Sequence, residues 1–386
     1  MRIYLDNAAT SWPKPEPVYA AVERWMRDEG ASAGRGAYRE AQFAQREVDA
    51  ARRGCAQLLG ADDPDQVVFG GNATDGLNLA IFGLVRPGDR VLTTVSDHNS
   101  VLRPLATLGE RAGVEVVRVP CDGQGFVDLD AWRGACRRPA RLAAFLHGSN
   151  VTGAVQPVAE MAALAREAGA LVLVDAAQSV GHLPVDVAEL GIDLLAASGH
   201  KGLLGPAGTG FLWIRPGVEA ELSPHRFGGT GADSDAPIAP TAMPQRFEAG
   251  SLNVPALAGI AAACEWLAER GVASLAVHEA ELTARLLGGL ESIDGVRIIG
   301  PPAGNRRAGV VSFTVRGYDP QEFAAMLDAT HGVQCRAGLH CAPLIHRALG
   351  THELGGAVRM SVGWSLTLAD VDAALAAVDE LAAAAI

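Results

Sequence analysis

Short, almost uninterrupted apolar runs alternate with stretches of helical periodicity from residue 15 to about residue 215. Apolar strands of this kind are typical of a parallel sheet that helices cover on both faces, because neither face then meets water. The runs that we predict as strands are Val67–Phe69, Arg90–Val95, Val114–Val119, Arg141–Leu146, Leu171–Asp175, Asp193–Ala197 and Gly208–Ile214. The pattern therefore indicates an α/β fold with a mostly parallel sheet.

The remainder of the 386 residues has a different pattern. Residues 222–250 are rich in Pro, Gly, Ser and Thr and show no clear periodicity. An irregular run of this length in a compact chain more often has a function than none. Beyond it we predict an α+β unit that packs beside the larger sheet. Its predicted helices are Pro255–Glu269, His278–Leu290, Pro320–Ala329, Pro343–Leu349 and Leu368–Ala385, and its strands are Val296–Ile299, Ala308–Val315, Val333–Cys335 and Val358–Val362.

Charge and cysteine content argue against several classes of protein. The net charge is −12 and no Lys/Arg cluster occurs, which disfavours nucleic-acid and anionic-membrane partners. The chain has no signal-like N-terminus and no apolar run of about 18 residues, so we expect a cytoplasmic protein with free thiols. Cys335 and Cys341 are spaced too widely for a structural zinc site, and we predict no metal.

The first strand-to-helix turn, residues 70–76, has features of a phosphate site. Ligands of α/β sheets bind at the carboxyl ends of strands, where free backbone amides, the helix dipole and the Thr74 hydroxyl would all favour an anion. Leu77 and Asn78 stand where a Walker A loop needs Lys and Ser/Thr, and no dinucleotide fingerprint occurs. Taken alone, the loop fits a plain strand-to-helix turn equally well.

Two later turns carry ionisable residues. Asp175 ends an apolar strand, where a carboxylate is costly unless it meets a cation or hydrogen-bond donors; a helix N-cap or a pyridinium nitrogen would each supply a partner. Lys201 follows another apolar run in the turn Ser198–Gly202. Lysines are very few in this chain, so Lys201 is not simply one charge of a solvated face, and a desolvated lysine amine forms Schiff bases.

A phosphate cradle, a strand-end Asp and a Lys in a Ser-x-His-Lys turn together suggest pyridoxal 5′-phosphate. With these motifs the chain resembles the cysteine desulfurase/selenocysteine lyase family, class V aminotransferases of PLP-dependent fold type I. The matching segments run almost end to end and are Tyr4–Ala9, Ser198–Lys201, Arg336–Cys341 and Val358–Ser361. The resemblance implies a large cofactor-binding domain over residues 15–255 and a smaller α+β domain, formed by residues 1–14 and 256–386, that carries the catalytic Cys loop.

The resemblance implies a role in cofactor binding for each matching residue. Lys201 matches the lysine that binds pyridoxal phosphate covalently, Asp175 the partner of the pyridine nitrogen, and Gln178 the partner of the ring hydroxyl. His98 matches a catalytic imidazole stacked on the ring, although a lone histidine is usually structural. The residues matching the phosphate site are Ala73, where relatives often carry a hydroxyl, Thr74, Ser198, His200 and, across a dimer interface, Ser251. A helix cap is the alternative for Ser251.

The resemblance also implies a substrate site. Asn150 and Arg359 match residues that hold the substrate carboxylate, a task that suits a planar guanidinium, and Arg336 is assigned to the same site. A surface ion pair is the alternative for Arg359, but its apolar strand makes an unpaired charge there costly. Three other histidines have no support from the pattern and are interpreted as structural: His147, His182 and His225.

Cys341 distinguishes among the activities of this family. Cys264 and Cys335 lie in apolar runs and are interpreted as core residues. Cys341 instead lies in a glycine-containing loop ahead of a predicted helix, next to His340 and near Arg336, where a helix N-terminus and cations favour the thiolate. The Arg-x-Gly-x-x-Cys pattern resembles the short loop of group II desulfurases, with Leu339 in place of a frequent His.

These features predict a homodimeric, pyridoxal-phosphate-dependent L-cysteine desulfurase that makes alanine and an enzyme persulfide, which passes to an acceptor protein or small thiol. The alternatives on the same scaffold are a selenocysteine lyase acting on L-selenocysteine, a C–S β-lyase that makes pyruvate, and a biosynthetic aminotransferase. A cofactor-binding protein without turnover is a further alternative, disfavoured by the combination of Lys, Asp, Arg and Cys.

Overall fold

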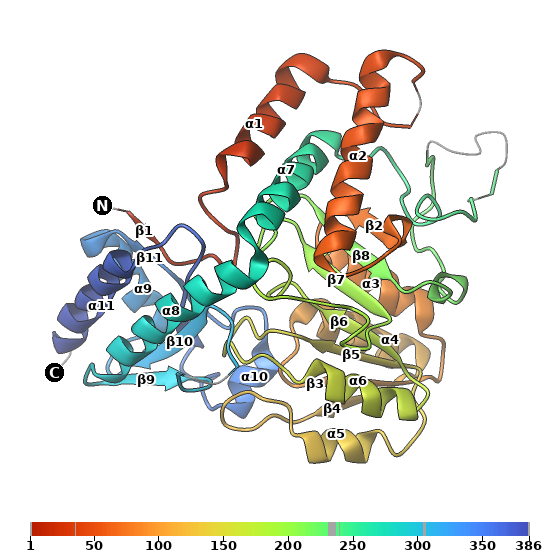
Figure 1. Ribbon diagram of the computed structural model, residues 1–386. Helices are drawn as coiled ribbons and strands as arrows, with labels where there is room; N and C mark the ends of the chain where they lie inside the picture. The colour runs from red at the N-terminus through yellow and green to blue at the C-terminus, as the bar shows by residue number, and fades with distance from the viewer. Residues whose placement is uncertain (1, 35, 231–236, 239, 304–305, 385–386) are drawn as a thin grey trace.

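The computed structural model describes residues 2–34, 36–230, 237–238, 240–303 and 306–384. Part of the predicted irregular segment 222–250 and the last residue of the predicted final helix therefore lie outside the described residues. Within the described part, a large sheet between two layers of helices lies beside a smaller sheet with helices of its own (Figure 1). No helix of the described residues is long and apolar enough to cross a membrane.

The large sheet has seven strands in the order β2-β8-β7-β6-β5-β3-β4. Its strands are β2 (Val67–Gly70), β3 (Arg90–Thr94), β4 (Glu115–Val119), β5 (Leu142–Leu146), β6 (Leu171–Asp175), β7 (Leu194–Ser198) and β8 (Gly210–Ile214). The five strands from β7 to β4 pair in parallel, and β8 is antiparallel to both β7 and β2. The predicted mostly parallel sheet is thereby confirmed.

Helices cover both faces of this sheet, as the apolar strands predict. Successive residues of a strand point to opposite faces, so that on β5 Ala144 packs with α3 and α4 while Phe145 packs with α2, α5, α6 and α7. The helices are α1 (Glu16–Arg24), α2 (Arg39–Leu58), α3 (Ala73–Leu84), α4 (Asn99–Ala112), α5 (Leu129–Ala135), α6 (Val158–Glu167) and α7 (Val254–Arg270).

The smaller sheet is antiparallel, in the order β12-β13-β10-β9, and packs on three helices through one apolar core. Its strands are β9 (Val296–Ile299), β10 (Val310–Val315), β12 (Arg336–Gly338) and β13 (Ala357–Ser361). The helices are α8 (Val272–Glu291), α9 (Pro320–His331) and α11 (Leu368–Ala383), and the short α10 (Pro343–Ala348) follows the Cys341 loop. α8 begins six residues before the predicted start at His278, and in this first part Val272 and Leu275 pack against the core of the large unit.

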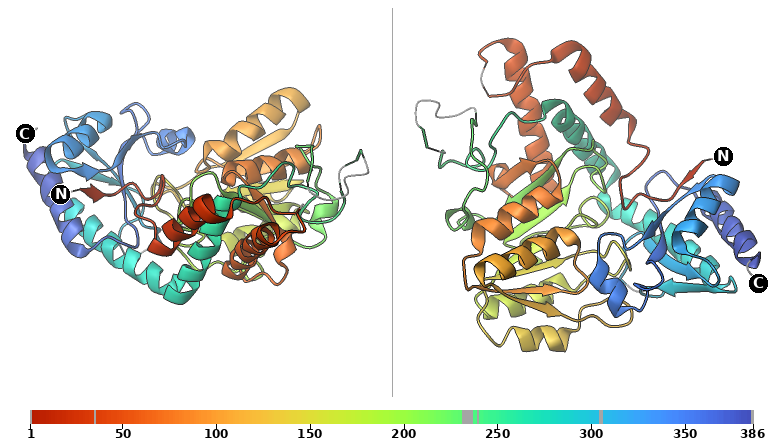
Figure 2. Two further views of the ribbon diagram at one scale, coloured as in Figure 1. Left: turned by 90° about the horizontal axis from the view of Figure 1, so that it is seen from above. Right: turned by 180° about the vertical axis from the view of Figure 1, so that it is seen from behind.

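The chain passes between the two units in the N-terminal segment and again from α7 to α8. β1 (Ile3–Tyr4) pairs in parallel with β11 (Val333–Gln334), which places the N-terminus beside the smaller sheet. α7 packs against α1 and α2 of the large unit, and α8 continues directly into the small unit (Figure 2). The predicted boundary at residues 255–256 thus coincides with the start of α7, whose packing lies with the large unit; the division into domains at that point stays a prediction.

Candidate active site

Most of the predicted site residues come together at the carboxyl edge of the parallel strands. One cavity there is lined by residues that follow β2, β3, β5, β6 and β7. Eight of its lining residues are ones that the sequence singles out: Ala73, Thr74, His98, Asn150, Asp175, Gln178, Ser198 and Lys201. Parallel strands end at the same edge of a sheet, which explains how residues spread over 130 positions of the chain meet.

The N-terminus of α3 forms one end of this cavity. Asn72 caps the helix by accepting a 3.0 Å hydrogen bond from the amide of Asp75, and the Ser198 hydroxyl accepts one of 3.1 Å from the amide of Ala73. The Thr74 and Ser100 hydroxyls are 2.7 Å apart. Backbone amides, hydroxyls and the positive end of a helix dipole are therefore concentrated at this end, an arrangement that suits an anion.

His200 precedes Lys201 in the chain but is not among the residues that line this cavity. Burial lowers the pKa of His200 to about 4, and the cations of Lys201 and Lys14 add to the effect. Its ring is therefore neutral at pH 7. The buried Nδ1 atom has no hydrogen-bond partner among the described residues. An unpaired buried polar atom of this kind is costly, so it marks a place where a ligand would be favoured.

The other end of the cavity holds Asp175 and Lys201. Burial lowers the pKa of Lys201 to about 8; the Asp175 carboxylate opposes this shift, while the guanidinium groups of Arg359 and Arg336 favour it. A fraction of the amine is therefore neutral near pH 7.5 and can act as a base or nucleophile. Asp175 accepts a 3.0 Å hydrogen bond from the amide of Ala177 within a turn. No helix lies between β6 and β7, where every residue is described, so the helix N-cap that the sequence analysis offered for this carboxylate is wrong.

Gln178 connects the cavity with the N-terminal segment. Its side-chain Nε2 donates a 2.8 Å hydrogen bond to the carbonyl of Ala8. Next to that segment, the Ser11 hydroxyl donates to the carbonyl of Lys201 at 2.9 Å, and Lys14 Nζ donates to the carbonyl of His200 at 3.0 Å. The residues just after the Tyr4–Ala9 motif thus hold the backbone of the turn that carries Lys201.

His98 caps α4 with its imidazole. The ring Nδ1 accepts a 3.1 Å hydrogen bond from the amide of Ser100, which places the proton of the neutral ring on Nε2. Burial lowers the pKa of His98; Asp175 opposes that shift, and Lys201 and Arg336 add to it. His98 is therefore mainly neutral at pH 7, with a fixed ring orientation.

Cys341 lies on a loop whose backbone is constrained. His340 and Cys341 have φ values of 49° and 59°, in the left-handed region that non-glycine residues rarely adopt. Asn150 Nδ2 donates a 2.7 Å hydrogen bond to the carbonyl of His340, and the amide of Asn99 donates one of 2.8 Å to the carbonyl of Cys341. Contacts from the large unit therefore hold the loop, and the Cys341 side chain stays exposed.

Arg359 is buried in β13, close to the same loop. Its Nη2 lies 2.7 Å from the carboxylate of Asp6, and its Nη1 donates a 3.2 Å hydrogen bond to the carbonyl of Asn150. Arg359 is thus paired, as its burial requires, and it is not a surface residue. Arg336 faces it across the β12–β13 pair but is exposed.

Ser251 lies apart from the cavity that holds Lys201. It lines a neighbouring hollow with Gly71, Arg226 and other residues of the 226–257 region. The segment before it is fixed by Glu248, whose carboxylate binds the Arg52 guanidinium at 2.8 and 2.9 Å and the amide of Phe69 at 2.7 Å. Within one chain, Ser251 is therefore placed near the sheet edge and does not line the Lys201 cavity.

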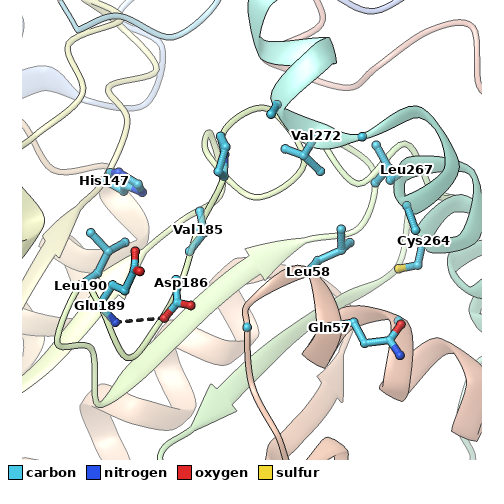
Figure 3. Close-up of a pocket in the computed structure, with 16 residues that line it drawn as sticks. Gln57, Leu58, His147, Val185, Asp186, Glu189, Leu190, Cys264, Leu267 and Val272 are labelled. Atoms are coloured by element: carbon cyan, nitrogen blue, oxygen red, sulfur yellow. Dashed lines mark hydrogen bonds between the residues drawn. The ribbon is translucent and has the colours of Figure 1, made fainter.

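A second cavity, of about 490 Å³, lies between α2, α7 and residues 184–190 (Figure 3). His147 and Cys264 line it, and it contains none of the predicted catalytic or ligand-binding residues. His182 does not line the Lys201 cavity either: its Nδ1 lies 2.9 Å from Glu279 of α8 and so links the two units. Cys335 packs against the small core, and burial raises the pKa of its thiol to about 12.

The amino-acid sequence matches the family model of class V aminotransferases over residues 3–374. The chain belongs to the class V aminotransferase family. It is 37% identical over 98% of its length to a probable cysteine desulfurase of Methanothermobacter thermautotrophicus, covering 94% of that protein. It is 39% identical over 93% of its length to a probable cysteine desulfurase of Pseudomonas aeruginosa, covering 88% of it.

Solved structures of class V aminotransferases share the whole fold. The apo cysteine desulfurase of Thermococcus onnurineus matches with a TM-score of 0.93 and 35% identity, over 99% of this chain and 95% of that one. The S-sulfonic acid form of the cysteine desulfurase CsdA of Escherichia coli matches with a TM-score of 0.87 and 31% identity, over 98% of this chain and 94% of that one. The expected PLP-dependent transferase fold type I is thereby confirmed.

Membership of the class V aminotransferases implies pyridoxal phosphate, and the residues present fit this group. The α3 N-terminus with the Thr74 and Ser198 hydroxyls suits its phosphate, and Asp175 suits a pyridinium nitrogen. Lys201 lines the same cavity with a lowered amine pKa. Among the described residues no cluster of His, Cys, Asp or Glu is suited to a metal ion.

Several residues of this class V aminotransferase site escaped the sequence reasoning. Asp97, fully buried beside His98, accepts hydrogen bonds from Thr93, Thr94 and Leu146 and so ties β3 to β5. A signal was available, because Asp97 follows the predicted strand Arg90–Val95 after one residue. Asp6 offered no signal beyond its position in the Tyr4–Ala9 motif, and Ser100 offered none. Lys14 could have been found by counting, since it and Lys201 are the only lysines of the chain.

Proposed function

We propose that this protein is a pyridoxal-phosphate-dependent cysteine desulfurase that converts L-cysteine to L-alanine and receives the sulfur on Cys341. The observation that carries the proposal is the placement of Cys341: its loop is hydrogen-bonded to Asn99 and to Asn150, which lines the Lys201 cavity, and its side chain is exposed. Similarity to cysteine desulfurases over nearly the whole chain supports it.

The chain's own residues would supply binding and proton transfer. Lys201 would attach pyridoxal phosphate, with Asp175 at the pyridine nitrogen, His98 against the ring, Gln178 at the ring hydroxyl, and the α3 N-terminus with Thr74, Ser198 and His200 at the phosphate. The bound group supplies an electron sink. Arg359, with Arg336 and Asn150 nearby, would hold the substrate carboxylate through charge-assisted hydrogen bonds.

Two steps then depend on side chains. Once free, the Lys201 amine accepts the Cα proton of the substrate, and its lowered pKa keeps part of it neutral for this purpose. The Cys341 thiolate attacks the substrate sulfur: an Sγ–S bond forms, the Cβ–S bond breaks, and its electron pair stays on the carbon side. Protonation of that carbon gives the methyl group of alanine, and Cys341 becomes a persulfide.

We further propose that the active unit is a homodimer in the cytoplasm that delivers the persulfide sulfur to an acceptor protein or a small thiol. Ser251 supports the dimer, because its segment is rigidly held by Glu248 yet Ser251 does not line the Lys201 cavity of its own chain. It would therefore serve the phosphate site of the neighbouring subunit. Full activity at a dilution at which light scattering finds only monomers would contradict the proposed homodimer.

The experiment that tests the activity is incubation of the holoenzyme with L-cysteine, followed by assays of alanine and pyruvate. Mass spectrometry should find added sulfur on the peptide that contains Cys341. Cys341→Ala should retain cofactor absorbance but lose persulfide and most alanine, whereas Cys335→Ala should keep both. Alanine formation at the parental rate by Cys341→Ala would refute the persulfide step, and pyruvate as the main product of the parent would establish a β-lyase instead.

A further inference from the structure

We propose that Asp6 is a positioning residue for substrate binding: it orients the Arg359 guanidinium so that the remaining N–H groups of Arg359 receive the substrate α-carboxylate. This inference rests on the proposed function and adds to it a residue from the N-terminal segment. Asp6 and Arg359 are 353 positions apart in the chain and are joined by a 2.7 Å contact between Oδ1 and Nη2.

The hydrogen bonds of Arg359 fix its guanidinium and leave some of the N–H donors of that group available. A guanidinium has five N–H groups. One binds the Asp6 carboxylate and one the carbonyl of Asn150, and Nε has no partner among the described residues. The Arg359 side chain is only 2% exposed, so few solvent molecules can satisfy the rest. Asp6 and Asn150 thus determine the plane of the group without using its full capacity for hydrogen bonds.

Charge gives Asp6 a second effect on Arg359. Arg336 pairs directly with Arg359 in the β12–β13 register, and two like charges opposite each other across strands repel. Burial and this neighbouring cation both disfavour a charged Arg359, whereas the Asp6 carboxylate favours it. Asp6 is the carboxylate that contacts Arg359 in the described part of the chain. Without it, the buried guanidinium would be expected to turn towards another acceptor or towards water.

The backbone around Asp6 is held by the same strand that carries Arg359. Asp6 forms a β-bridge with Ser361, two residues beyond Arg359. On either side of it, the amide of Ser361 donates to the carbonyl of Leu5 at 2.7 Å and the amide of Ala8 donates to the Ser361 hydroxyl at 2.8 Å. The position of the carboxylate is therefore set by β13 itself, which is the geometry expected of a fixed orienting group.

The opposite reading is that Asp6 occupies the place of the substrate carboxylate and must be displaced. The two readings differ in sign: removal of a positioning group weakens carboxylate binding, whereas removal of a competitor strengthens it. The bridge to Ser361 favours the positioning role, because it leaves the Asp6 backbone little freedom to withdraw. The variants needed are Asp6→Ala and Asp6→Asn, which keeps the side-chain shape, with Asp372→Asn as control from the exposed Arg285–Asp372 pair.

The test compares two ligands of the holoenzyme that differ only in the carboxylate, L-alanine and ethylamine, by titration of the cofactor absorbance. We expect Asp6→Ala to weaken L-alanine binding at least about tenfold and Asp6→Asn to weaken it less, with ethylamine unchanged in both. In turnover of L-cysteine, KM should rise while kcat changes little, the pattern of a lost ground-state contact. Asp372→Asn should match the parent.

Equal losses of affinity for L-alanine and ethylamine in the Asp6 variants would show that Asp6 has only a structural role. Tighter or unchanged L-alanine binding would also overturn the inference. Asp6→Asn keeps the test valid if Asp6→Ala does not fold. Failure of the parent itself to bind L-alanine or to convert L-cysteine would instead refute the proposed function, and this inference with it. The two failures are thus distinguished by the parent enzyme alone.

Discussion

The backbone amide of Asn99 donates a 2.8 Å hydrogen bond to the carbonyl of Cys341. Asn99 follows His98 at the start of α4 in the large unit, whereas Cys341 belongs to the loop between β12 and α10 of the small unit. One hydrogen bond therefore ties the exposed thiol to the residue next to the imidazole of the Lys201 cavity. The reactivity of the site should depend on this junction.

Cys341 should be the first thiol to react with iodoacetamide in the native protein at pH 7.5. The other five thiols are disfavoured because Cys55 and Cys264 are buried and because burial raises the thiol pKa of Cys121, of Cys136 and, to about 12, of Cys335. Peptide mass spectrometry after short exposure should find label mainly on Cys341. In Cys341→Ala the rapid phase of iodoacetamide labelling should be absent. Rapid labelling of Cys335 in the native parent would contradict this picture.

The two lysines should react with amine reagents at unusually low pH. Burial lowers the pKa of both Lys14 and Lys201 to about 8, whereas a lysine in solution has a pKa near 10.5. At pH 7.5 the neutral, reactive fraction is thus on the order of a hundredfold larger than for an ordinary lysine. Reductive methylation, followed by mass spectrometry, should show rates that level off just above pH 8.

The cofactor provides a control for the lysine prediction. Bound pyridoxal phosphate should protect Lys201 but leave the rate at Lys14 unchanged, because only Lys201 lines the cavity. In urea both lysines should react as ordinary amines do. Methylation of Lys14 that rises only above pH 10 in the native protein would show that its amine is not desolvated.

Asp97→Asn should lower the free energy of unfolding by about 1–3 kcal/mol, because an amide leaves at least one of the buried donors around Asp97 without an acceptor. The pH dependence has a defined sign. Burial raises the pKa of Asp97 to about 6, so its contribution to stability is complete below its unfolded pKa near 3.8 and is lost as pH rises through 6.

Urea unfolding at several pH values between 4 and 7 measures this contribution. The parent minus Asp97→Asn difference in the free energy of unfolding should decrease with rising pH over that range. A difference that increases with pH would mean that the carboxylate is stabilised in the charged form. Asp62→Asn, at an exposed bend, should show little such dependence and serves as the control.

Arg52→Ala should destabilise the protein by about 3–5 kcal/mol, since it leaves the buried Glu248 carboxylate without its cation. The same variant should loosen the segment that leads to Ser251 and thereby weaken retention of pyridoxal phosphate during dialysis. Arg27→Ala breaks an exposed helical ion pair with Glu23 and should cost at most about 1 kcal/mol. Similar melting temperatures for the two variants would refute the assigned role of Glu248.

Local pattern was enough to predict most of the architecture. The strands β5 and β6 were predicted within a residue because both faces are buried and the run of apolar residues is unbroken. Lys201 and Asp175 stood out for the same reason, since an ionisable residue at the end of an apolar strand is conspicuous. The start of α8 was placed late, because its first turn carries no cap or charge that marks a helix N-terminus.

The amino-acid sequence by itself determined the elements, the mostly parallel sheet and the chemical types of the residues at its carboxyl edge, since these follow from periodicity and from the cost of burying charge. Only the tertiary structure decided which distant groups meet. Neither the pairing of Asp6 with Arg359 nor the hydrogen bond from Asn150 to the His340 carbonyl leaves a local trace. Such contacts join segments that lie far apart in the chain, and the energy that favours them is spread over many side chains that no local pattern relates.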